Sequence, residues 1–301
     1  MVKTSNIKKK ELREYITGDA FVLPVLVFIF LFIIWPVIQS LVLAFFRWDG
    51  VGPWRYVGLK NFVKMFTKEP LFYQSLKNSV IFAVVTTFGE MAIGFTAAVL
   101  IDLGIRCWKV YRFIFYLPVL LSQVAVSLLW TKIYAEDGLV NTLLGVLHLE
   151  NLQNVWLGDP RFALWAVCLV SMWQFGGWHM IFFLAGMQGI DPQIYESAKI
   201  DGASTLRRVF SITIPMLKNV FFIITILSLI MGFKAFDMIY VMTSGGPAMA
   251  TEILGTLLYT QAFDVQRYGY ASVIAVVMVI IAMLFSMFYI RLSGYQKEAV
   301  E

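Results

Sequence analysis

Side chains capable of covalent or redox chemistry are scarce in this sequence. The 301 residues include only two cysteines, Cys107 and Cys168, and two histidines, His148 and His179, which form no cluster at metal-ligand spacing. The chain also lacks the G-x-x-x-x-G-K-[ST] pattern that cradles nucleotide phosphates and the G-x-S-x-G turn of serine hydrolases. We therefore expect no catalytic residue, no metal and no cofactor on this chain, and both cysteines reduced.

The most informative spacing lies in the segment 188–218. Asp191 followed by Pro192 is typical of a helix N-cap with proline at the first helical position. We expect a helix over 192–200, which Gly202 then breaks.

A second helix is expected directly after this turn. Ser204 can cap it, and Pro215 marks the entry to the next apolar segment. Ala198 and Gly202 lie four residues apart and leave a face with little side-chain bulk, which another surface can approach closely. A purely connecting segment needs fewer residues and no such capping, so the pattern favours a role in contacting a partner.

This segment resembles the signature loop of binding-protein-dependent ABC importer permeases. The family pattern is E-A-A, three residues, G, nine residues, I-x-L-P, and it is matched by Glu196-Ser197-Ala198, Gly202 and Ile212-Thr213-Ile214-Pro215. Ser197 and Ile214 depart from the pattern but keep roughly the right size. In that family the loop is a coupling helix that docks into a groove of the ATPase subunit. The resemblance implies docking foremost through Glu196 and Gly202, within a coupling set of Glu196, Ser197, Ala198, Asp201, Gly202 and Pro215.

Further segments resemble the carbohydrate branch of this family, and the likeness covers nearly the whole chain. They are Arg47-Trp48-Asp49, Val57-Gly58-Leu59-Lys60-Asn61-Phe62, Asn78, the run from Phe236 to Pro247, Thr251-Glu252 and Tyr268-Gly269-Tyr270-Ala271-Ser272. That branch includes subunits of maltose, multiple-sugar, lactose and glycerol-3-phosphate importers. The resemblance implies that the chain forms half of the translocation pathway for a sugar or oligosaccharide, as a transport subunit and not as an enzyme.

The resemblance also implies the partners. We expect a heterodimer with a second homologous permease subunit, two ABC ATPase subunits that bind ATP and Mg on separate chains, and an external solute-binding protein. The location implied is the plasma (inner) membrane of a bacterium or archaeon, where the chain contacts membrane lipid and no nucleic acid.

The composition independently requires a membrane. Hydrophobic residues make up 59% of the chain and charged residues 14%, and the mean hydropathy is +0.76. These values exclude a disordered chain, a disulfide scaffold and an ordinary soluble enzyme. A span needs about 20 mostly apolar residues. We therefore expect six transmembrane helices, at 20–46, 78–101, 113–134, 162–187, 219–242 and 269–290. The family resemblance implies that they form an all-α, type I ABC importer permease-like fold.

Basic residues set the expected orientation. The side that holds both termini carries 14 lysines and arginines and the opposite side carries 9, so the positive-inside rule places both termini in the cytoplasm. The net charge of +5 thus reports orientation and not nucleic-acid binding. The expected organisation is a cytoplasmic N-tail over 1–19, the permease domain over 20–290 with its coupling loop at 188–218, and a cytoplasmic C-tail over 291–301.

Polar side chains inside the spans mark the expected solute pathway, because such groups normally face a cavity or a partner helix. Two helical stripes stand out, in the fourth and fifth spans. They consist of Ser171, Gln174, Phe175 and Trp178, and of Ser228, Met231, Gly232 and Ala235. A tryptophan face beside an amide suits a sugar, and in the resembling family these two helices bind the solute in mid-membrane. Helix packing is the alternative interpretation of both stripes.

Four further polar residues lie at or near membrane depth. Lys234 and Asp237 are also assigned to the solute pathway. They lie three residues apart on one expected helix, where they can form an ion pair; alternatively, Asp237 is a carboxylate exposed to water. Glu90 is expected to pair with the partner subunit, or alternatively to contact solute. His179 is interpreted as a helix-contact histidine.

The outer side carries three weaker features. Tyr56, Leu59, Phe62, Val63 and Phe66 recur among lysines at helical spacing, which predicts a short amphipathic helix on the outer membrane surface. The acidic loop 135–160 either meets a soluble partner or is simply solvated. The Ser244–Pro247 turn either shapes the outer gate, meets the binding protein, or is only a tight loop.

Three rival functions remain open. An ion-coupled secondary transporter would need inverted repeats and broken helices, and we find no convincing repeat. A scaffold without a pore would leave uptake intact when the chain is deleted. Import of glycerol-3-phosphate or another polar solute is the rival within the family, but Lys234 is the only basic residue near mid-membrane, which favours a neutral sugar.

Overall fold

The computed structural model describes residues 22–293, and in this part the chain is almost entirely helical. The expected N-tail, the first two residues of the first expected span and all of the C-tail beyond Ser293 lie outside the described residues. The chain divides into two compact units, described separately below. The first comprises residues up to Lys64 together with Gln261–Val276, and the second comprises Met65–Thr260 together with the residues from Val277 onward.

The first unit begins with the apolar helix Val22–Leu43, which runs through the π-helical turn η1 (Phe30–Ile34) into α2 (Trp35–Leu43). No residue in its most apolar window is buried, as expected of a span that faces lipid. Strands β1 (Phe46–Arg47) and β2 (Arg55–Tyr56) then form a short antiparallel pair in which Phe46 lies opposite Tyr56.

Helix α3 (Lys60–Lys68) is the amphipathic helix predicted on the outer side. It begins at Lys60, so the predicted stripe is wrong at Tyr56, whose backbone pairs in β2, and at Leu59, which lies in the turn before the helix. Phe62 packs on Phe45 with ring centroids 5.4 Å apart. The Asn61 side chain donates to the carbonyls of Ala44 (3.0 Å) and Phe46 (2.9 Å), which ties α3 to the end of the first span.

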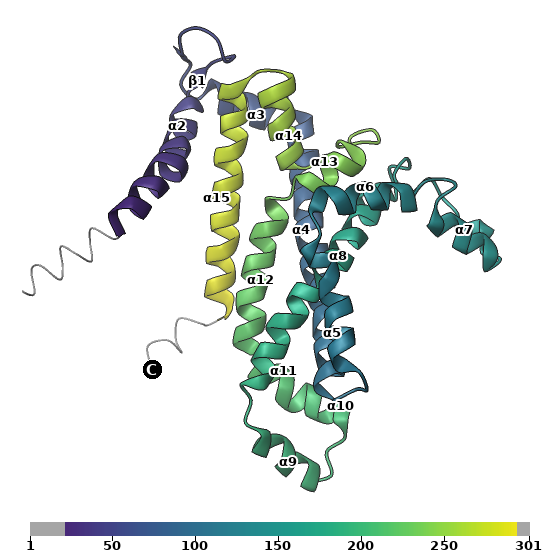
Figure 1. Ribbon diagram of the computed structural model, residues 1–301. Coiled ribbons are helices and arrows are strands. Elements are labelled where there is room, and N and C mark those ends of the chain that lie inside the picture. Colours follow the sequence, from purple (N-terminus) through teal and green to yellow (C-terminus); the bar gives the residue numbers. More distant parts are fainter. Residues whose placement is uncertain (1–21, 294–301) are drawn as a thin grey trace, which may run out of the picture. The chain divides into compact units, whose positions relative to one another are not determined.

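The second unit is built around α4 (Pro70–Asp102) and α8 (Ala163–Gln188), with α12 (Lys218–Phe233) against them (Figure 1). Small residues let these helices approach closely. A Cβ on Gly94 would lie 2.7 Å from the Met180 nitrogen, and a Cβ on Gly232 would lie 2.7 Å from the Ala83 Cα. These glycines therefore set the spacing of the three helices.

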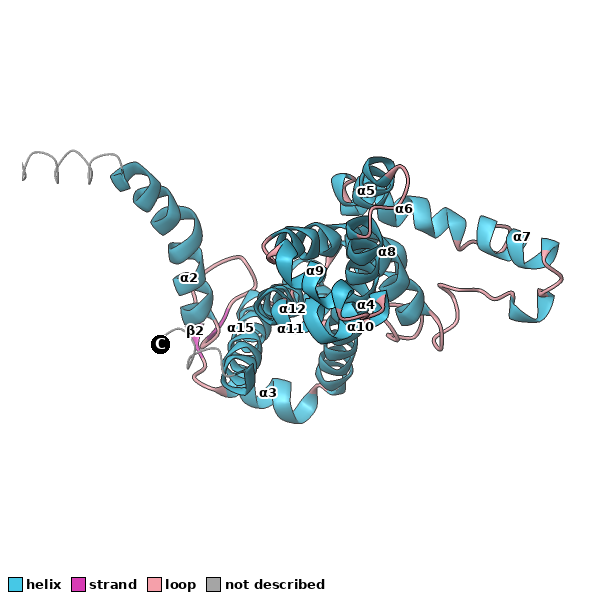
Figure 2. Ribbon diagram, turned by 90° about the horizontal axis from the view of Figure 1, so that it is seen from below, coloured by secondary structure: helices cyan, strands magenta, loops and turns pink. Residues whose placement is uncertain are grey.

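The remaining elements are short, apart from the last helix. They are α5 (Trp108–Tyr116), η2 (Leu117–Leu120), α6 (Gln123–Ile133), α7 (Leu139–Val146), η3 (Glu150–Leu152), α9 (Pro192–Ile200), α10 (Thr205–Arg208), η4 (Val209–Thr213), α11 (Ile214–Met216), α13 (Asp237–Thr243), α14 (Leu254–Tyr259), η5 (Thr260–Asp264) and α15 (Tyr268–Ser293). Figure 2 shows the same elements by secondary structure, seen from the end that carries α9.

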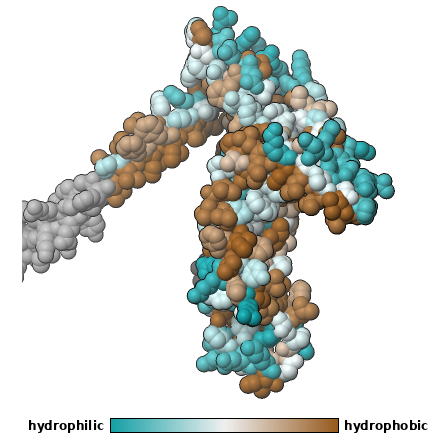
Figure 3. Space-filling view, turned by 45° about the vertical axis from the view of Figure 1, so that its right-hand side comes forward, coloured by the Kyte–Doolittle hydropathy of each residue, from teal (hydrophilic) through white to brown (hydrophobic). Residues whose placement is uncertain are grey.

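Four helices are long and apolar enough to cross a membrane: Val22–Leu43, Pro70–Asp102, Ala163–Gln188 and Tyr268–Arg291. They correspond to the first, second, fourth and sixth predicted spans, although α4 begins well before the predicted residue 78. Counting each of two bent helix pairs as one span gives six. Hydrophobic surface covers much of the middle of the helical body, and hydrophilic residues gather where α9 and α10 lie (Figure 3).

The third and fifth predicted spans are each part of a bent helix pair. The third bends by 100° between Leu120 and Gln123, where Ser122 caps α6 and its side chain accepts from the Ala125 N–H. The fifth ends at Phe233, and its helix meets the preceding helical segment at 67°. Total length and hydropathy alone cannot show these breaks, because each bent pair as a whole is long and apolar enough to count as one span.

Candidate solute cavity and coupling helix

A cavity of about 160 Å³ lies within the second unit, between α4, α8, α12 and the segment that leads into α13. Six of the nine predicted pathway residues line it: Ser171, Phe175, Trp178, Ser228, Met231 and Gly232. Ala235 from the predicted second stripe also lines it. The structure thus brings the two predicted stripes to one cavity.

The other three predicted pathway residues lie elsewhere. Gln174 is buried, and its side-chain amide donates to the Leu121 carbonyl at 3.1 Å, which fastens the bend of the third span to α8. Lys234 caps the end of α12 and Asp237 begins α13, so the expectation that they share one helix is wrong. Among the described residues no ion pair joins them. Gly255 lies close to the backbone at this break, since a Cβ on it would be 2.5 Å from the Ala235 carbonyl oxygen.

A buried polar network crosses the cavity wall. The Ser171 hydroxyl on α8 donates to Glu90 Oε1 on α4 at 2.8 Å. His179 Nε2 lies 2.8 Å from the Ser228 hydroxyl on α12, and His179 Nδ1 lies 3.1 Å from the Phe175 carbonyl and 3.8 Å from Glu90 Oε2. With Nδ1 protonated, a neutral His179 donates to Phe175 and accepts from Ser228.

This network revises two expectations. Glu90, expected to pair with the partner subunit, has its hydrogen-bond partner on the same chain and lines the cavity. His179 does join two helices, as expected, but it also lines the cavity. An ionisable residue in an apolar span was the signal that singled out both Glu90 and His179, but it did not show which groups each side chain would face.

Sequence reasoning missed several lining residues. Phe82, Thr86, Gln123, Phe236 and Met238 complete the wall. The Thr86 hydroxyl donates to the Phe82 carbonyl of its own helix at 2.7 Å, a local bond that a helix interior permits at any threonine. Such residues carry no signal of their own, because only the packing of α4 against α8 and α12 decides which face is enclosed.

The chemistry of the lining suits a polyhydroxylated solute. Phe175 and Trp178 offer ring faces for apolar C–H groups, while Ser171, His179 and Ser228 offer hydrogen-bonding groups for hydroxyls. The lining has Glu90 as its acidic side chain and holds no lysine or arginine. Complete small-molecule sites enclose about 300–1,000 Å³, so this cavity of about 160 Å³ is smaller than such a site.

The predicted coupling segment is confirmed in its local structure. Helix α9 spans Pro192–Ile200, and the Asp191 carboxylate accepts from the Gln193 N–H at 2.9 Å. Gly202 ends it with φ of +74°, a conformation that glycine adopts without steric cost. The Ser204 hydroxyl accepts from the Arg207 N–H at 3.3 Å and begins the helix Thr205–Met216.

The exposed face of this segment carries the predicted docking residues. Glu196, Ser197, Asp201, Gly202 and Pro215 are exposed, and Ala198 is half-buried. No atom lies within 4 Å of a Cβ placed on Gly202. Exposed apolar side chains flank the turn, at Ile200 (86% exposed) and Leu206 (70%). This much exposed apolar surface is typical of a protein-binding site.

The other side of α9 is attached to the helix that follows it. The Tyr195 hydroxyl lies 2.9 Å from the Thr213 hydroxyl, and Thr213 is buried. This contact links α9 to the helical segment that leads into α12, whose far half lines the cavity.

The Ser244–Pro247 turn is held to α4 by side-chain hydrogen bonds. The Thr251 hydroxyl donates to the Gly246 carbonyl at 2.6 Å, and the Asn78 amide donates to the carbonyls of Ala250 (3.0 Å) and Glu252 (2.9 Å). Burial raises the pKa of Glu252, opposed by a hydrogen bond from Thr256. The turn is thus joined through Thr251 to the segment that Asn78 of α4 holds in place.

Comparison with known proteins decides the family. Residues 91–296 match the family described as the binding-protein-dependent transport system inner membrane component. The chain belongs to this family of permease subunits. The predicted location in the inner membrane is confirmed at this level by the family description.

Individual relatives extend the match over almost the whole permease. This chain is 38% identical over 285 residues to the probable ABC transporter permease protein YurN of Bacillus subtilis (strain 168), and the alignment covers 92% of this chain and 96% of the relative. It is 34% identical over 285 residues to the lactose transport system permease protein LacF of Rhizobium radiobacter, covering 92% and 95%.

A solved structure shares the fold of the permease. A bacterial ABC transporter involved in the import of the acidic polysaccharide alginate contains a chain that matches with a TM-score of 0.83 at 22% identity, covering 96% of this chain and 99% of that one. The predicted ABC importer permease-like fold is therefore confirmed.

Proposed function

We propose that this permease forms half of the translocation pathway for a neutral sugar or oligosaccharide. The cavity carries the proposal, because it combines the rings of Phe175 and Trp178 with the hydroxyls of Ser171 and Ser228 and has no basic side chain in its lining. Relatives named for lactose, trehalose/maltose and multiple-sugar transport support the same solute class.

A second homologous permease subunit would supply the facing wall. The cavity of about 160 Å³ on this chain is too small to enclose a disaccharide alone. An external solute-binding protein would deliver the sugar at the other side of the membrane from α9. A structure of the alginate transporter with a periplasmic protein bound supports such delivery in a protein of this fold.

Energy would enter through α9. Two ATPase subunits that bind ATP and Mg on separate chains would grip its exposed face, where Glu196 and Gly202 are the main contacts. Closure of the ATPases would move α9, and Tyr195 would pass this motion through Thr213 to α12. Because Ser228 and Met231 of α12 line the cavity, the shift would change which side of the membrane the cavity faces. This scheme requires α9 and both termini in the cytoplasm.

Substitution of Trp178 tests the solute assignment. Removing a ring face of about 50 Å² at ~25–30 cal/mol per Å² corresponds to roughly 1.4 kcal/mol, or tenfold in affinity. Trp178→Ala should therefore raise the KM for sugar uptake about tenfold in vesicles that contain the complete importer. Trp173→Ala is the matched control, because Trp173 lies on the same helix, 40% exposed, outside the cavity lining. Equal KM changes in both variants would refute the assignment.

A further inference from the structure

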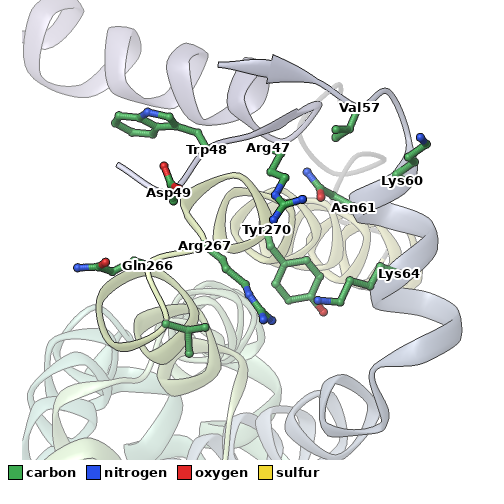
Figure 4. Close-up of a pocket in the computed structure, with 11 residues that line it drawn as sticks. Arg47, Trp48, Asp49, Val57, Lys60, Asn61, Lys64, Gln266, Arg267 and Tyr270 are labelled. Atoms are coloured by element: carbon green, nitrogen blue, oxygen red, sulfur yellow. The ribbon is translucent and has the colours of Figure 1, made fainter. Parts of the chain in front are cut away.

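The first unit contains a cavity of its own, of about 580 Å³ (Figure 4). It is formed by β1 and the turn that follows it, by α3, and by the residues that lead into α15. Its volume falls within the ~300–1,000 Å³ typical of small-ligand sites. Nothing in the transport scheme above uses it.

The lining is strongly basic. Arg47, Lys60, Lys64 and Arg267 line it together, against one acidic side chain, Asp49. None of the four cations forms an ion pair with a residue of the described chain. Cations gathered in one cavity repel one another unless an anion lies between them.

Three of these cations converge. Figure 4 shows Arg47, Lys64 and Arg267 directed toward the ring of Tyr270, with Asp49 on the side of Trp48. Lys64 Nζ lies 4.8 Å from the centre of that ring, and Tyr270 is buried. The space around Tyr270 is therefore the most positive part of the cavity.

The depth of this cavity follows from the helices that flank it. The lipid-facing helix Val22–Leu43 ends four residues before Arg47, and the span Tyr268–Arg291 begins directly after Arg267. Aromatic residues cluster beside it, with the rings of Trp48 and Trp54 5.9 Å apart. Tryptophan and tyrosine are enriched at the membrane–water boundary. The cavity thus lies at headgroup depth, where phosphate is the abundant anion.

Helix α3 adds an apolar surface beside the cations. Leu59 (62% exposed) and Val63 (56% exposed) alternate along the chain with Lys60 and Lys64. A ligand with an anionic head and an apolar body satisfies both surfaces, whereas an acidic protein segment would leave the leucine and valine exposed to water.

We propose that the cavity framed by Arg47, Lys64 and Arg267 binds the phosphate of an anionic phospholipid headgroup. The guanidinium groups supply charge-assisted hydrogen bonds to the phosphate oxygens, and Lys64 supplies a further charge. The bonds from Asn61 to Ala44 and Phe46 hold α3 and the end of the first span in place for this contact. Bound lipid would thereby fasten the first helix to α3.

Native mass spectrometry of the full-length detergent-solubilised chain tests this, with phosphatidylglycerol and phosphatidylcholine as alternative probes. The wild type should bind phosphatidylglycerol in preference to phosphatidylcholine. Arg47→Gln/Arg267→Gln should lower phosphatidylglycerol affinity roughly thirtyfold, taken as about fivefold for each basic residue near an anionic surface. The matched control is Arg55→Gln/Lys68→Gln, because Arg55 lies opposite Arg47 in the strand pair and Lys68 lies one turn beyond Lys64, both outside the cavity.

Each result decides the proposal, provided that thermal unfolding without added lipid shows both double variants folded. Selective loss in the cavity variant supports it. Equal loss in cavity and control variants, or equal binding of the two lipids by the wild type, overturns it. Displacement of lipid by millimolar inorganic phosphate would identify a free-phosphate site instead. Weakened docking of the external binding protein with unchanged lipid affinity would identify an acidic protein surface as the ligand, and would equally overturn it.

Discussion

Gly202 offers the sharpest test of energy coupling. At this residue, the effect of backbone strain can be calculated separately from the effect of a side chain that blocks close approach of the ATPase. Its φ of +74° costs any other L-residue about 1–2 kcal/mol. Among the described residues, no atom lies within 4 Å of a Cβ placed on Gly202, so the first carbon of a side chain meets no clash there. Even if this whole strain energy reduced the binding free energy of the ATPase subunits, their affinity would fall by at most roughly thirtyfold.

The close approach of an ATPase groove predicts a larger effect. Gly202→Leu should weaken recruitment of the ATPase subunits more than about a hundredfold, measured by co-purification and by affinity titration. Gly202→Asn should not restore it, although asparagine tolerates the left-handed backbone better than other residues. The helices of the second unit should stay intact in both variants, because the Cβ of the new side chain meets no atom of the residues that the structure describes.

Gly104 provides the matched control for this experiment. It has φ of +75°, and its Cβ position is likewise empty to 4 Å, but it lies in the loop between α4 and α5 and outside the signature motif. Gly104→Leu should carry the same strain and recruit the ATPases normally. If Gly202→Leu stays within the strain limit, or if Gly202→Asn recovers full recruitment, then docking at Gly202 is refuted.

Three further predictions concern the second unit. Asn78→Ala removes two hydrogen bonds, one to the buried Glu252 carbonyl and one to the part-buried Ala250 carbonyl, and should lower the free energy of unfolding by about 2 kcal/mol, read from thermal unfolding; an unchanged Tm would contradict this. Burial raises the pKa of Glu252 above 4.5, so its stability contribution is present below that pH and is lost as pH rises through the raised value. Glu252→Gln should flatten this dependence, and an unaltered pH profile would exclude Glu252 as its source. Gly94→Leu should cost about 3 kcal/mol, since its Cβ would meet the Met180 nitrogen, and should reduce the folded fraction in size-exclusion chromatography.

The local structure of the coupling segment was predictable because its signals are local. An aspartate before proline, a glycine and a serine specify caps and a turn within a few residues, and α9 begins and ends where the spacing predicted. The long apolar helices were predictable for a similar reason, since length and hydropathy suffice to define them.

The cavity was predictable only in part. Stripes on α8 and α12 follow from helical periodicity, but whether a polar residue on a stripe faces a cavity depends on bends elsewhere. Gln174 belongs to its stripe, yet it bonds to Leu121 because the third span breaks there. Lys234 and Asp237 were misjudged because α12 ends at Phe233 and α13 begins at Asp237, a break that falls inside the apolar segment 219–242.

The central claim is that ATP, used by partner chains, drives sugar through a pathway half of which this permease provides. The most direct measurement is uptake of a radiolabelled sugar into proteoliposomes that contain both permease subunits and both ATPases, with binding protein outside and ATP inside. The account predicts uptake that requires both ATP and binding protein, stops with vanadate and survives ionophores. Uptake that runs on an ion gradient without ATP would contradict it.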